Sequence, residues 1–377
     1  MKITGVRLQL CHFPLPETFS PSWRPGFPMA TNGCAIVRLQ TDEGLEGVSA
    51  GVLVADEAKG LANLLRLALV GRDPTQVEDI FKILRTSTRV VGMRAWHVEP
   101  ACWDIIGKAA GVPVWRLLGG ANDRVRAYAS TGELREPKRR VDDVAELVEQ
   151  GFTAVKLRIR WPTIEEDLAL VTAVREAQPD LTLMVDANQG WHVHGFAGYP
   201  EWDLARATRT ADALRELGVE WLEEPLDQHD YRGMAALRER TGIRVAAGEM
   251  LSDLHGFRDL VEHRAADILQ PDAVLTGGIL MARKVAGMAE AAGLGFAPHT
   301  WTNGIGLAVN LQVMGAVGNA AWCEFPIDPP GWTPEARDAM LTESIGIEED
   351  GFVKLSEAPG LGITLDDERI AAHGQEV

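Results

Sequence analysis

Residues 153–160 read TAVKLRIR, an apolar stretch that carries a lysine and an arginine two positions apart. If the stretch is a β-strand, its period of two places Lys156 and Arg158 on one face and the neighbouring aliphatic side chains on the other. The apolar face can pack against helices, but two buried cations need negatively charged partners. The stretch therefore predicts a buried strand whose polar face lines a site rich in acidic groups.

On both sides of this strand, from Val125 onward, short apolar runs alternate with amphipathic helical patterns. The runs are VRAYA (125–129), TAVKLRI (153–159), LTLMVDA (181–187), VEWLEEP (219–225), IRVAAGE (243–249), DILQPDA (267–273), LGFAPH (294–299) and AAWCEF (320–325). Such alternation predicts a parallel sheet with crossover helices. Eight units in about 200 residues fit a (β/α)8-type barrel. An open doubly wound sheet is the alternative, but no GxGxxG motif follows the first strand.

The residues on either side of this region show different patterns. Residues 1–124 contain strand patterns followed by helical ones, which predicts an α+β domain. We expect the barrel domain to span 125–346 and a C-terminal segment, 347–377, to return to the first domain. Within that segment LGITLDDE (361–368) is the expected returning strand.

Charge and cysteine usage restrict the class of protein. A formal charge of −17 argues against nucleic acid as a partner and gives no support to binding an anionic membrane. The four cysteines form no CxxC motif, and we find no signal peptide or membrane span, which favours a reducing cytoplasm. The basic run REPKRR (135–140) is interpreted as a solvated surface.

Polar residues follow the apolar runs at the C-terminal ends of the expected strands, where barrel enzymes carry their catalytic groups. In chain order they are Lys156, Arg158, Asp186, Asn188, Glu223, Glu224, Glu249, Asp272, His299 and Glu324. Each strand from the second to the eighth contributes at least one of them. We therefore expect these side chains to meet at one mouth of the barrel.

Two groups of these residues indicate a chemistry. Asp186, Glu249 and one of the adjacent pair Glu223 and Glu224 suit a hard divalent cation, and incomplete protein coordination favours Mg²⁺. Asp272 ends the strand next to that of His299, and a carboxylate beside a histidine makes it a general base.

The ordered set WDIIGKAAGVPVWRLLGG (103–120), VKLR, VDANQGW, WLEEP, AAGE, QPDAVLTGG, PHTW and the late Glu324 resembles the mandelate racemase-like subgroup of the enolase superfamily. The resemblance covers essentially the whole chain. It implies Mg²⁺ ligands at Asp186, Glu223 and Glu249, and an acid/base dyad of His299 and Asp272. Glu324 is then a hydrogen-bond donor to a substrate carboxylate, which requires it to be protonated or to share a proton, and a homo-oligomer is the expected assembly. Asn188, at the end of its strand, is a candidate for substrate binding.

The resemblance also implies a reaction and a cap. The shared reaction is removal of the proton α to a carboxylate, assisted by Mg²⁺. The first domain becomes a cap whose loops, near 19–31 and 49–57, cover the barrel mouth. In the first loop the favoured role of Trp23 and Phe27 is to fold the loop. The alternative is that they shield a hydrophobic substrate, so Trp23 and Arg24 are candidates for substrate binding, with Arg24 holding a second carboxylate. His192 and His194 are further candidates.

One position departs from the family pattern. Where related racemases have Lys-x-Lys with the second lysine as a base, this chain has Lys156-Leu157-Arg158. An arginine is a poor base near neutral pH. This favours a sugar-acid dehydratase that works from one face with His299, while Lys156 assists Mg²⁺ at the carboxylate and Arg158 binds substrate. The alternative is a racemase or epimerase of an α-hydroxy acid or amino acid derivative, and a cycloisomerase comes third.

Two other readings compete. Gly47-Val48-Ser49-Ala50-Gly51 matches the GxSxG elbow of α/β-hydrolases, but it follows a hairpin rather than the strand of an α/β sheet. A non-catalytic binding protein on the same fold is the second. The joint presence of the metal set, the dyad and Glu324 argues against it.

Overall fold

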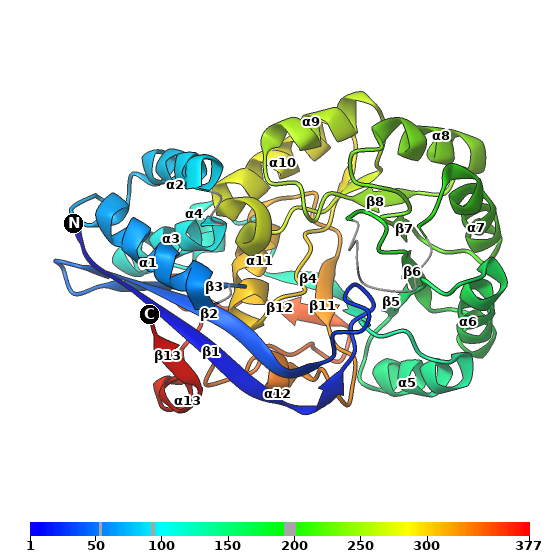
Figure 1. The fold of residues 1–377 in the computed structure, drawn as a ribbon, viewed down its shortest axis with the longest axis horizontal. Coiled ribbons are helices and arrows are strands. Elements are labelled where there is room, and N and C mark those ends of the chain that lie inside the picture. Colours follow the sequence, from blue (N-terminus) through cyan, green and yellow to red (C-terminus); the bar gives the residue numbers. More distant parts are fainter. Residues whose placement is uncertain (53–54, 92–94, 192–200) are drawn as a thin grey trace.

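The structure, a computed structural model, describes residues 1–52, 55–91, 95–191 and 201–377. Figure 1 shows two parts side by side, an N-terminal part that we call the cap and a larger part, the sheet domain, in which helices surround parallel strands. Among the described residues, no helix has both the length and the apolar character needed to cross a membrane.

The cap contains an antiparallel sheet covered by helices. Its elements are β1 (Ile3–Phe19), β2 (Met29–Thr41), β3 (Glu46–Gly51), α1 (Ala55–Leu69), α2 (Val77–Val91), η1 (Trp96–Val98), α3 (Glu99–Ala110) and α4 (Val114–Leu117). Apolar residues of β1 and β2, such as Leu8 and Val37, pack with Leu61 of α1 and Ile105 of α3 in a core of its own.

The sheet domain alternates strands and helices. Its elements are β4 (Arg124–Ser130), α5 (Pro137–Glu149), β5 (Ala154–Arg158), α6 (Ile164–Ala177), β6 (Thr182–Asp186), α7 (Leu204–Glu216), β7 (Leu222–Glu223), α8 (Tyr231–Thr241), β8 (Val245–Ala247), α9 (Leu254–Glu262), β9 (Ile268–Leu269), η2 (Ala273–Gly277), α10 (Gly278–Ala292), β10 (Gly295–Phe296), α11 (Gly304–Ala316) and β11 (Cys323–Pro326). The expected alternation from Val125 onward is confirmed.

The strands of this domain form a curled parallel sheet in the order β10-β9-β8-β7-β6-β5-β4-β11. Every neighbouring pair along this path is parallel. Between the two end strands, an isolated parallel bridge joins Phe296 of β10 to Ala320, just before β11. Complete closure into a (β/α)8 barrel stays a prediction.

The inner face of the sheet is filled by a layer of side chains. It contains Tyr128, Ala154, Met184, Trp221, Ala246, Ile268, Ala297 and Trp322, one from each strand or its immediate flank. Two residues further along, and therefore on the same face, come Lys156, Asp186, Glu223, His299 and Glu324. The apolar layer therefore lies directly beneath the polar side chains at the C-terminal ends of the strands.

The C-terminal segment supplies the remaining elements, α12 (Pro334–Arg337), β12 (Phe352–Lys354), α13 (Asp367–His373) and β13 (Gly374–Glu376). β12 pairs with β4, whereas β13 adds to the edge of the cap sheet beside β1. The prediction of a strand at 361–368 is wrong, because the chain there makes only an isolated bridge at Leu365 before α13 begins. The strand that does reach the cap lies later, at 374–376.

The basic run at 135–140 also differs from its prediction as a solvated surface. Arg140 is 1% exposed, and its Nη1 lies 2.7 Å from Asp328 Oδ1. Arg135 pairs with Asp143 at 2.6 Å and with Glu133 at 2.8 Å. Asp328 comes from a distant part of the chain, which the local sequence does not reveal, and this partner makes burial of Arg140 possible.

Candidate active site

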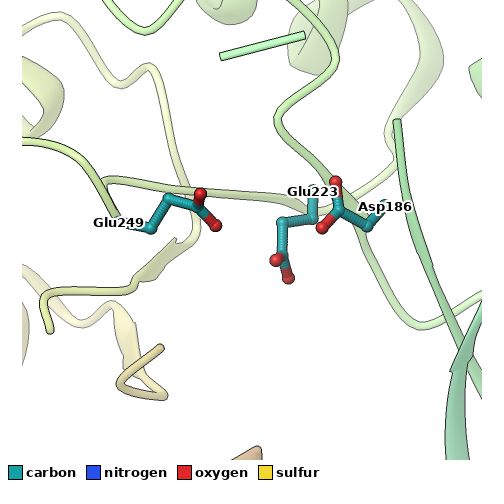
Figure 2. Close-up of side chains that lie close together, drawn as sticks. All are labelled: Asp186, Glu223 and Glu249. Atoms are coloured by element: carbon teal, nitrogen blue, oxygen red, sulfur yellow. The ribbon is translucent and has the colours of Figure 1, made fainter. Parts of the chain in front are cut away.

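Three carboxylates converge at the C-terminal ends of neighbouring strands. Asp186 and Glu223 end β6 and β7, and Glu249 follows β8. One oxygen of each lies within 4.8 Å of the others, and all three side chains are buried. Figure 2 shows the three groups directed into a shared space from separate segments of the chain. Carboxylate oxygens at this spacing suit a hard divalent cation.

The charge balance around these groups also fits a divalent cation. Among the described residues, buried carboxyl groups outnumber the buried cations Lys156, Arg158 and His299; the acids are Asp186, Glu223, Glu224, Glu249, Asp272 and Glu324. Burial raises the pKa of Glu223, Lys156 opposes the rise and Asp186 adds to it, which leaves the pKa at about 7. An additional positive charge offsets this excess, so both the donor set and the electrostatics fit Mg²⁺.

Lys156 points its ammonium group into the centre of the carboxylate cluster. It donates a hydrogen bond to Glu223, and its Nζ lies 2.8 Å from Glu324 Oε1 and 3.7 Å from Asp186 Oδ2. Burial lowers the pKa of Lys156, but the charges of Glu223 and Glu324 outweigh burial and raise it above its ordinary value. Lys156 is therefore a fixed cation beside the expected metal ligands.

Arg158 is held by three protein acceptors. It donates through Nη1 to Asp186, through Nε to the carbonyl of Thr131 at 2.7 Å, and through Nη2 to Ser130 Oγ at 3.3 Å. Burial lowers the pKa of Arg158, but Asp186 and the other carboxylates raise it above its ordinary value. A guanidinium in this state binds and orients but does not accept a proton.

His299 and Asp272 lie together as expected. His299 Nδ1 donates to Asp272 Oδ2 at 2.8 Å, and Asp272 Oδ1 accepts from the backbone N–H of Val274 at 2.8 Å and from Asn310 Nδ2 at 3.2 Å. These contacts fix the carboxylate, which in turn orients the imidazole and leaves Nε2 on the cavity side, 3.6 Å from Glu249. This is the arrangement of a general base with a positioning carboxylate.

The protonation of His299 depends on the metal ligands next to it. Burial lowers the pKa of His299, but the charges of Glu249 and Glu324 and the hydrogen bond with Asp272 raise it to about 10. Neutralising Glu249 removes the largest of the raising influences. The pKa therefore falls towards the range in which an imidazole accepts protons at neutral pH.

Glu324 does not have the environment expected of a protonated hydrogen-bond donor. It accepts from Ser130 Oγ and from the backbone N–H of Thr300, each at 2.7 Å. Burial raises the pKa of Glu324, but Lys156, His299 and Arg158 outweigh burial and lower it to about 2. These three cations favour the ionised form of Glu324 in the absence of substrate, and its role as a hydrogen-bond donor to a substrate carboxylate stays a prediction.

A cavity of about 410 Å³ opens over this site. Both predicted cap loops reach it, through Trp23, Arg24 and Met29 of the first and Val52 of the second, whereas Phe27 of the first loop is 46% exposed and lies elsewhere. The guanidinium of Arg158 lies 5.2 Å from the centre of the Trp23 ring.

Asn188, expected to bind substrate, lines the same cavity. Its φ of 46° lies in the left-handed region, which asparagine tolerates better than most residues. Its Oδ1 accepts from Ser22 Oγ at 2.9 Å, so the cap loop is tied directly to the end of β6.

The choice between the adjacent glutamates is visible in the structure. Glu223 joins the carboxylate cluster, whereas Glu224, with a φ of 44°, turns away so that its carboxylate occupies the space beside Gly190. Both oxygens of Glu224 are buried, and no hydrogen-bond partner for them is found in the part of the chain that the structure describes. Burial and the charge of Glu249 raise its pKa well above the ordinary value, which favours the neutral form.

Several residues at the cavity were not predicted. Trp191, Trp301 and Trp332 line it together with Trp23, and we call these four residues the indole wall. Trp191 and Trp301 stand in the motifs VDANQGW and PHTW, directly after strand-end residues, so their position in the chain is a signal that could have identified them. Trp332 lies in a loop beyond β11 and carries no such signal.

The remaining candidates lie outside the site or outside the described residues. His192 and His194 fall in the range 192–200, which the structure does not describe. Ser49, the centre of the GxSxG match, is buried inside the antiparallel strand β3 and is paired there with β2, so it does not stand at the sharp turn that a nucleophile elbow requires.

Comparison with known proteins agrees with this geometry. Residues 139–369 match the family model described as enolase C-terminal domain-like. Residues 23–119 match the mandelate racemase/muconate lactonizing enzyme N-terminal domain. The two matches correspond to the sheet domain with much of the C-terminal segment, and to the cap.

Individual relatives cover several reactions. The chain is 32% identical to D-galactarolactone cycloisomerase from Agrobacterium fabrum, over 97% of each chain. It is 28% identical to N-succinyl-L-Arg/Lys racemase from Bacillus cereus, over 98% of this chain and 97% of the other. The crystal structure of L-talarate dehydratase from Polaromonas sp. JS666, complexed with Mg and L-glucarate, superposes with a TM-score of 0.82 at 30% identity, over 100% and 98% of the two chains.

The family models and relatives together span the whole architecture, from the cap to the strand ends that carry the carboxylates. The chain belongs to the mandelate racemase/muconate lactonizing enzyme family of the enolase superfamily.

Proposed function

We propose that this protein is a Mg²⁺-dependent dehydratase that converts a sugar acid to a 2-keto-3-deoxy acid. The observation that carries the proposal is the asymmetry of proton acceptors. His299, oriented by Asp272 at 2.8 Å, faces the cavity, whereas Arg158 is an ion-paired cation with a raised pKa. Elimination from one face needs a single acid/base, and this site offers one well-placed candidate.

The reaction follows from this arrangement. Nε2 of His299 takes the α-proton, the electron pair of the C2–H bond forms a C2=C3 double bond, and the C3–O bond breaks. The imidazolium then gives its proton to the departing hydroxyl group, which leaves as water. The resulting enol becomes the 2-keto acid. One residue thus acts first as base and then as acid.

Asp186, Glu223 and Glu249 would hold Mg²⁺, which when bound supplies electrostatic stabilisation for charge that develops on the substrate carboxylate. Lys156 adds a second fixed positive charge beside the same ligands. Arg158 orients the substrate from the end of β5, and Asp272 keeps the imidazole in one orientation.

A racemase or epimerase is the alternative, since relatives include racemases. Racemisation by proton transfer requires an acceptor on each face of the α-carbon, and Arg158 provides a poor one. A cycloisomerase is the third candidate, supported by the relative from Agrobacterium fabrum.

The first test is a screen of aldonic and aldaric acids with Mg²⁺, with 2-keto acid formation as the readout. The His299→Asn variant should lose turnover by at least about 10³-fold, whereas Arg158→Lys should retain a measurable fraction. Exchange of the substrate α-proton with deuterated solvent gives an independent readout. Exchange by His299→Asn at the wild-type rate would show a second base and favour the racemase.

A further inference from the structure

The cavity has two chemically different halves. Arg158, Asn188, Glu249 and His299 lie at the strand ends, where the proposed reaction takes place. The other half is lined mainly by apolar side chains, namely the indole wall (Trp23, Trp191, Trp301 and Trp332) together with Phe19, Met29, Met250 and Leu275. A substrate whose carboxylate is placed at the strand ends extends the rest of its chain into this second half.

The indole N–H groups of three of the four residues of the indole wall are hydrogen-bonded or buried. Trp191 Nε1 donates to Glu249 Oε1 at 3.0 Å, and Trp301 Nε1 donates to Ser130 Oγ at 2.7 Å. Trp332 Nε1 is fully buried. These three rings therefore offer carbon, and not an N–H donor, to a ligand.

Few other polar atoms in this half are available to a ligand. Asn32 uses its Nδ2 on the carbonyls of Ala336 and Arg337, both at 3.0 Å, and Thr302 Oγ1 is buried away from solvent. Among the described residues that line this half, Arg24 and the indole nitrogen of Trp23 remain as donors, and the amide nitrogen of Asn188 adds one from the strand ends.

We propose that the substrate is a 2,3-dihydroxy acid whose chain beyond C3 is apolar, such as an alkyl- or aryl-bearing or terminally deoxygenated acid, and that the indole wall selects it. This inference rests on the dehydration proposed above and narrows its substrate. The reaction needs hydroxyl groups only at C2 and C3, so the inferred acid keeps these two and lacks the further hydroxyl groups of an aldonic or aldaric acid. Each further hydroxyl group placed against carbon loses its hydrogen bonds to water without replacement, which weakens binding by about tenfold or more.

Indole faces also stack on the C–H faces of sugars, so aromatic residues alone do not decide the matter. A polyhydroxy chain, however, presents hydroxyl groups around its whole circumference. Too few hydrogen-bond partners remain in this half of the cavity for those hydroxyl groups. The polar side-chain atoms described above are either hydrogen-bonded within the protein or buried, in Trp191, Trp301, Trp332, Asn32 and Thr302. The hydrogen-bond inventory therefore favours an apolar chain.

Binding can be measured without turnover. Acids that lack the C3 hydroxyl cannot be dehydrated across C2–C3, so 2-hydroxyhexanoate and a 3-deoxyhexonate of the same C2 configuration form a matched pair. In isothermal titration of the Mg²⁺-loaded protein, 2-hydroxyhexanoate should bind at least about 30-fold more tightly. Equal or tighter binding of the 3-deoxyhexonate would overturn the inference.

A second matched pair tests turnover. 2,3-Dihydroxyhexanoate should give a kcat/KM for 2-keto acid formation at least about 30-fold above that of a hexonate with the same C2 and C3 configuration. If the apolar acids bind tightly but none loses water, the proposed dehydration fails while the assignment of the apolar half stands. If only hexonates react, the dehydration stands and the inference fails.

The cap loop supplies a matched pair of variants. Trp23→Gln should reduce the preference for 2-hydroxyhexanoate by about tenfold or more, whereas Phe27→Gln, on the same loop but outside the described cavity lining, should keep it. Circular dichroism and Mg²⁺ titration show whether each variant is folded. A folded Trp23→Gln with an unchanged preference would contradict the proposed role of the indole wall.

Discussion

At the residue scale, Glu324 shows how neighbours decide the chemistry of a side chain. The carboxylate ends the inward face of β11, where Lys156 lies at 2.8 Å and the N–H of Thr300 at 2.7 Å. Every close partner is a donor or a cation, so the ionised form is the stable one, with a pKa of about 2. In this environment Glu324 neutralises Lys156 and anchors the chain that carries His299.

Replacing Glu324 by Gln separates the two roles considered for it. A glutamine amide can donate a hydrogen bond, so a donor role predicts retained activity. The ionised acceptor predicts a loss of kcat/KM of about a hundredfold or more, because Lys156 loses a charged partner. Steady-state kinetics with Mg²⁺ measures the difference, and Glu290→Gln, at an exposed position of α10, is the control. Wild-type kinetics in Glu324→Gln would support the donor role.

At the scale of elements, hydrogen bonds join the segment after β1 to the loop after β4, next to the site. The backbone N–H of Ser22 donates to the carbonyl of Gly132 at 2.8 Å. Asp328, beyond β11, accepts from the N–H groups of Gly132 and Glu133 at 2.9 and 2.8 Å, and is itself paired with the buried Arg140. The buried ion pair thus fixes the loop against which the cap places Trp23.

Gly132 allows this close approach, since a Cβ there would clash with the Phe19 ring and lie 2.8 Å from the Trp301 ring. Gly132→Ala should raise KM by about tenfold or more and destabilise the protein by about 1–3 kcal/mol, because the cap loop must move. Gly287→Ala in α10, where a Cβ meets open space, should instead stabilise by about 0.5–1 kcal/mol. Thermal unfolding and kinetics on both variants check this. Equal effects from the two substitutions would contradict the close packing at Gly132.

At the scale of the whole molecule, Glu99 links the cap to the sheet domain. This residue begins α3 in the cap, and its carboxylate accepts the backbone N–H groups of Ile279 and Leu280 at the start of α10, at 2.8 and 3.0 Å. Trp103 Nε1 donates to it at 2.8 Å. Burial raises the pKa of Glu99, the three hydrogen bonds oppose the rise, and the pKa remains at about 7.

This raised pKa predicts a pH-dependent stability. In the unfolded chain the carboxyl ionises near pH 4.5, whereas in the folded protein it does so near 7. The stability that the protonated form contributes is complete below pH 4.5 and is lost as pH rises through 7. The loss is up to about 3 kcal/mol. Urea unfolding at pH 4.5 and 7.5 measures it. Glu99→Gln, which does not ionise, should show a smaller decrease, and an identical decrease would assign the effect to other groups.

Much of the site could be predicted from the sequence. In parallel βα units the carboxyl ends of all strands meet at one edge, so a polar residue at each strand end implies a shared site without knowledge of any contact. Period two then places Lys156 above Ala154 and Asp186 above Met184 on the inner face. For these reasons the eight strands, the three carboxylates and the proximity of His299 and Asp272 follow from local patterns alone.

Other features depend on residues far apart in the chain. The sequence by itself determined the order of strands and the chemical identity of the groups at their ends. Only the tertiary structure decided that Lys156, His299 and Arg158 surround Glu324, that Arg140 is buried on Asp328, and that residues 374–376 pair with β1. It also decided that Trp301 turns its N–H towards Ser130 and its carbon towards the cavity. The physical reason is that protonation, burial of charge and the direction of a hydrogen bond depend on all neighbours within a few ångströms, and folding brings those neighbours from the whole length of the chain.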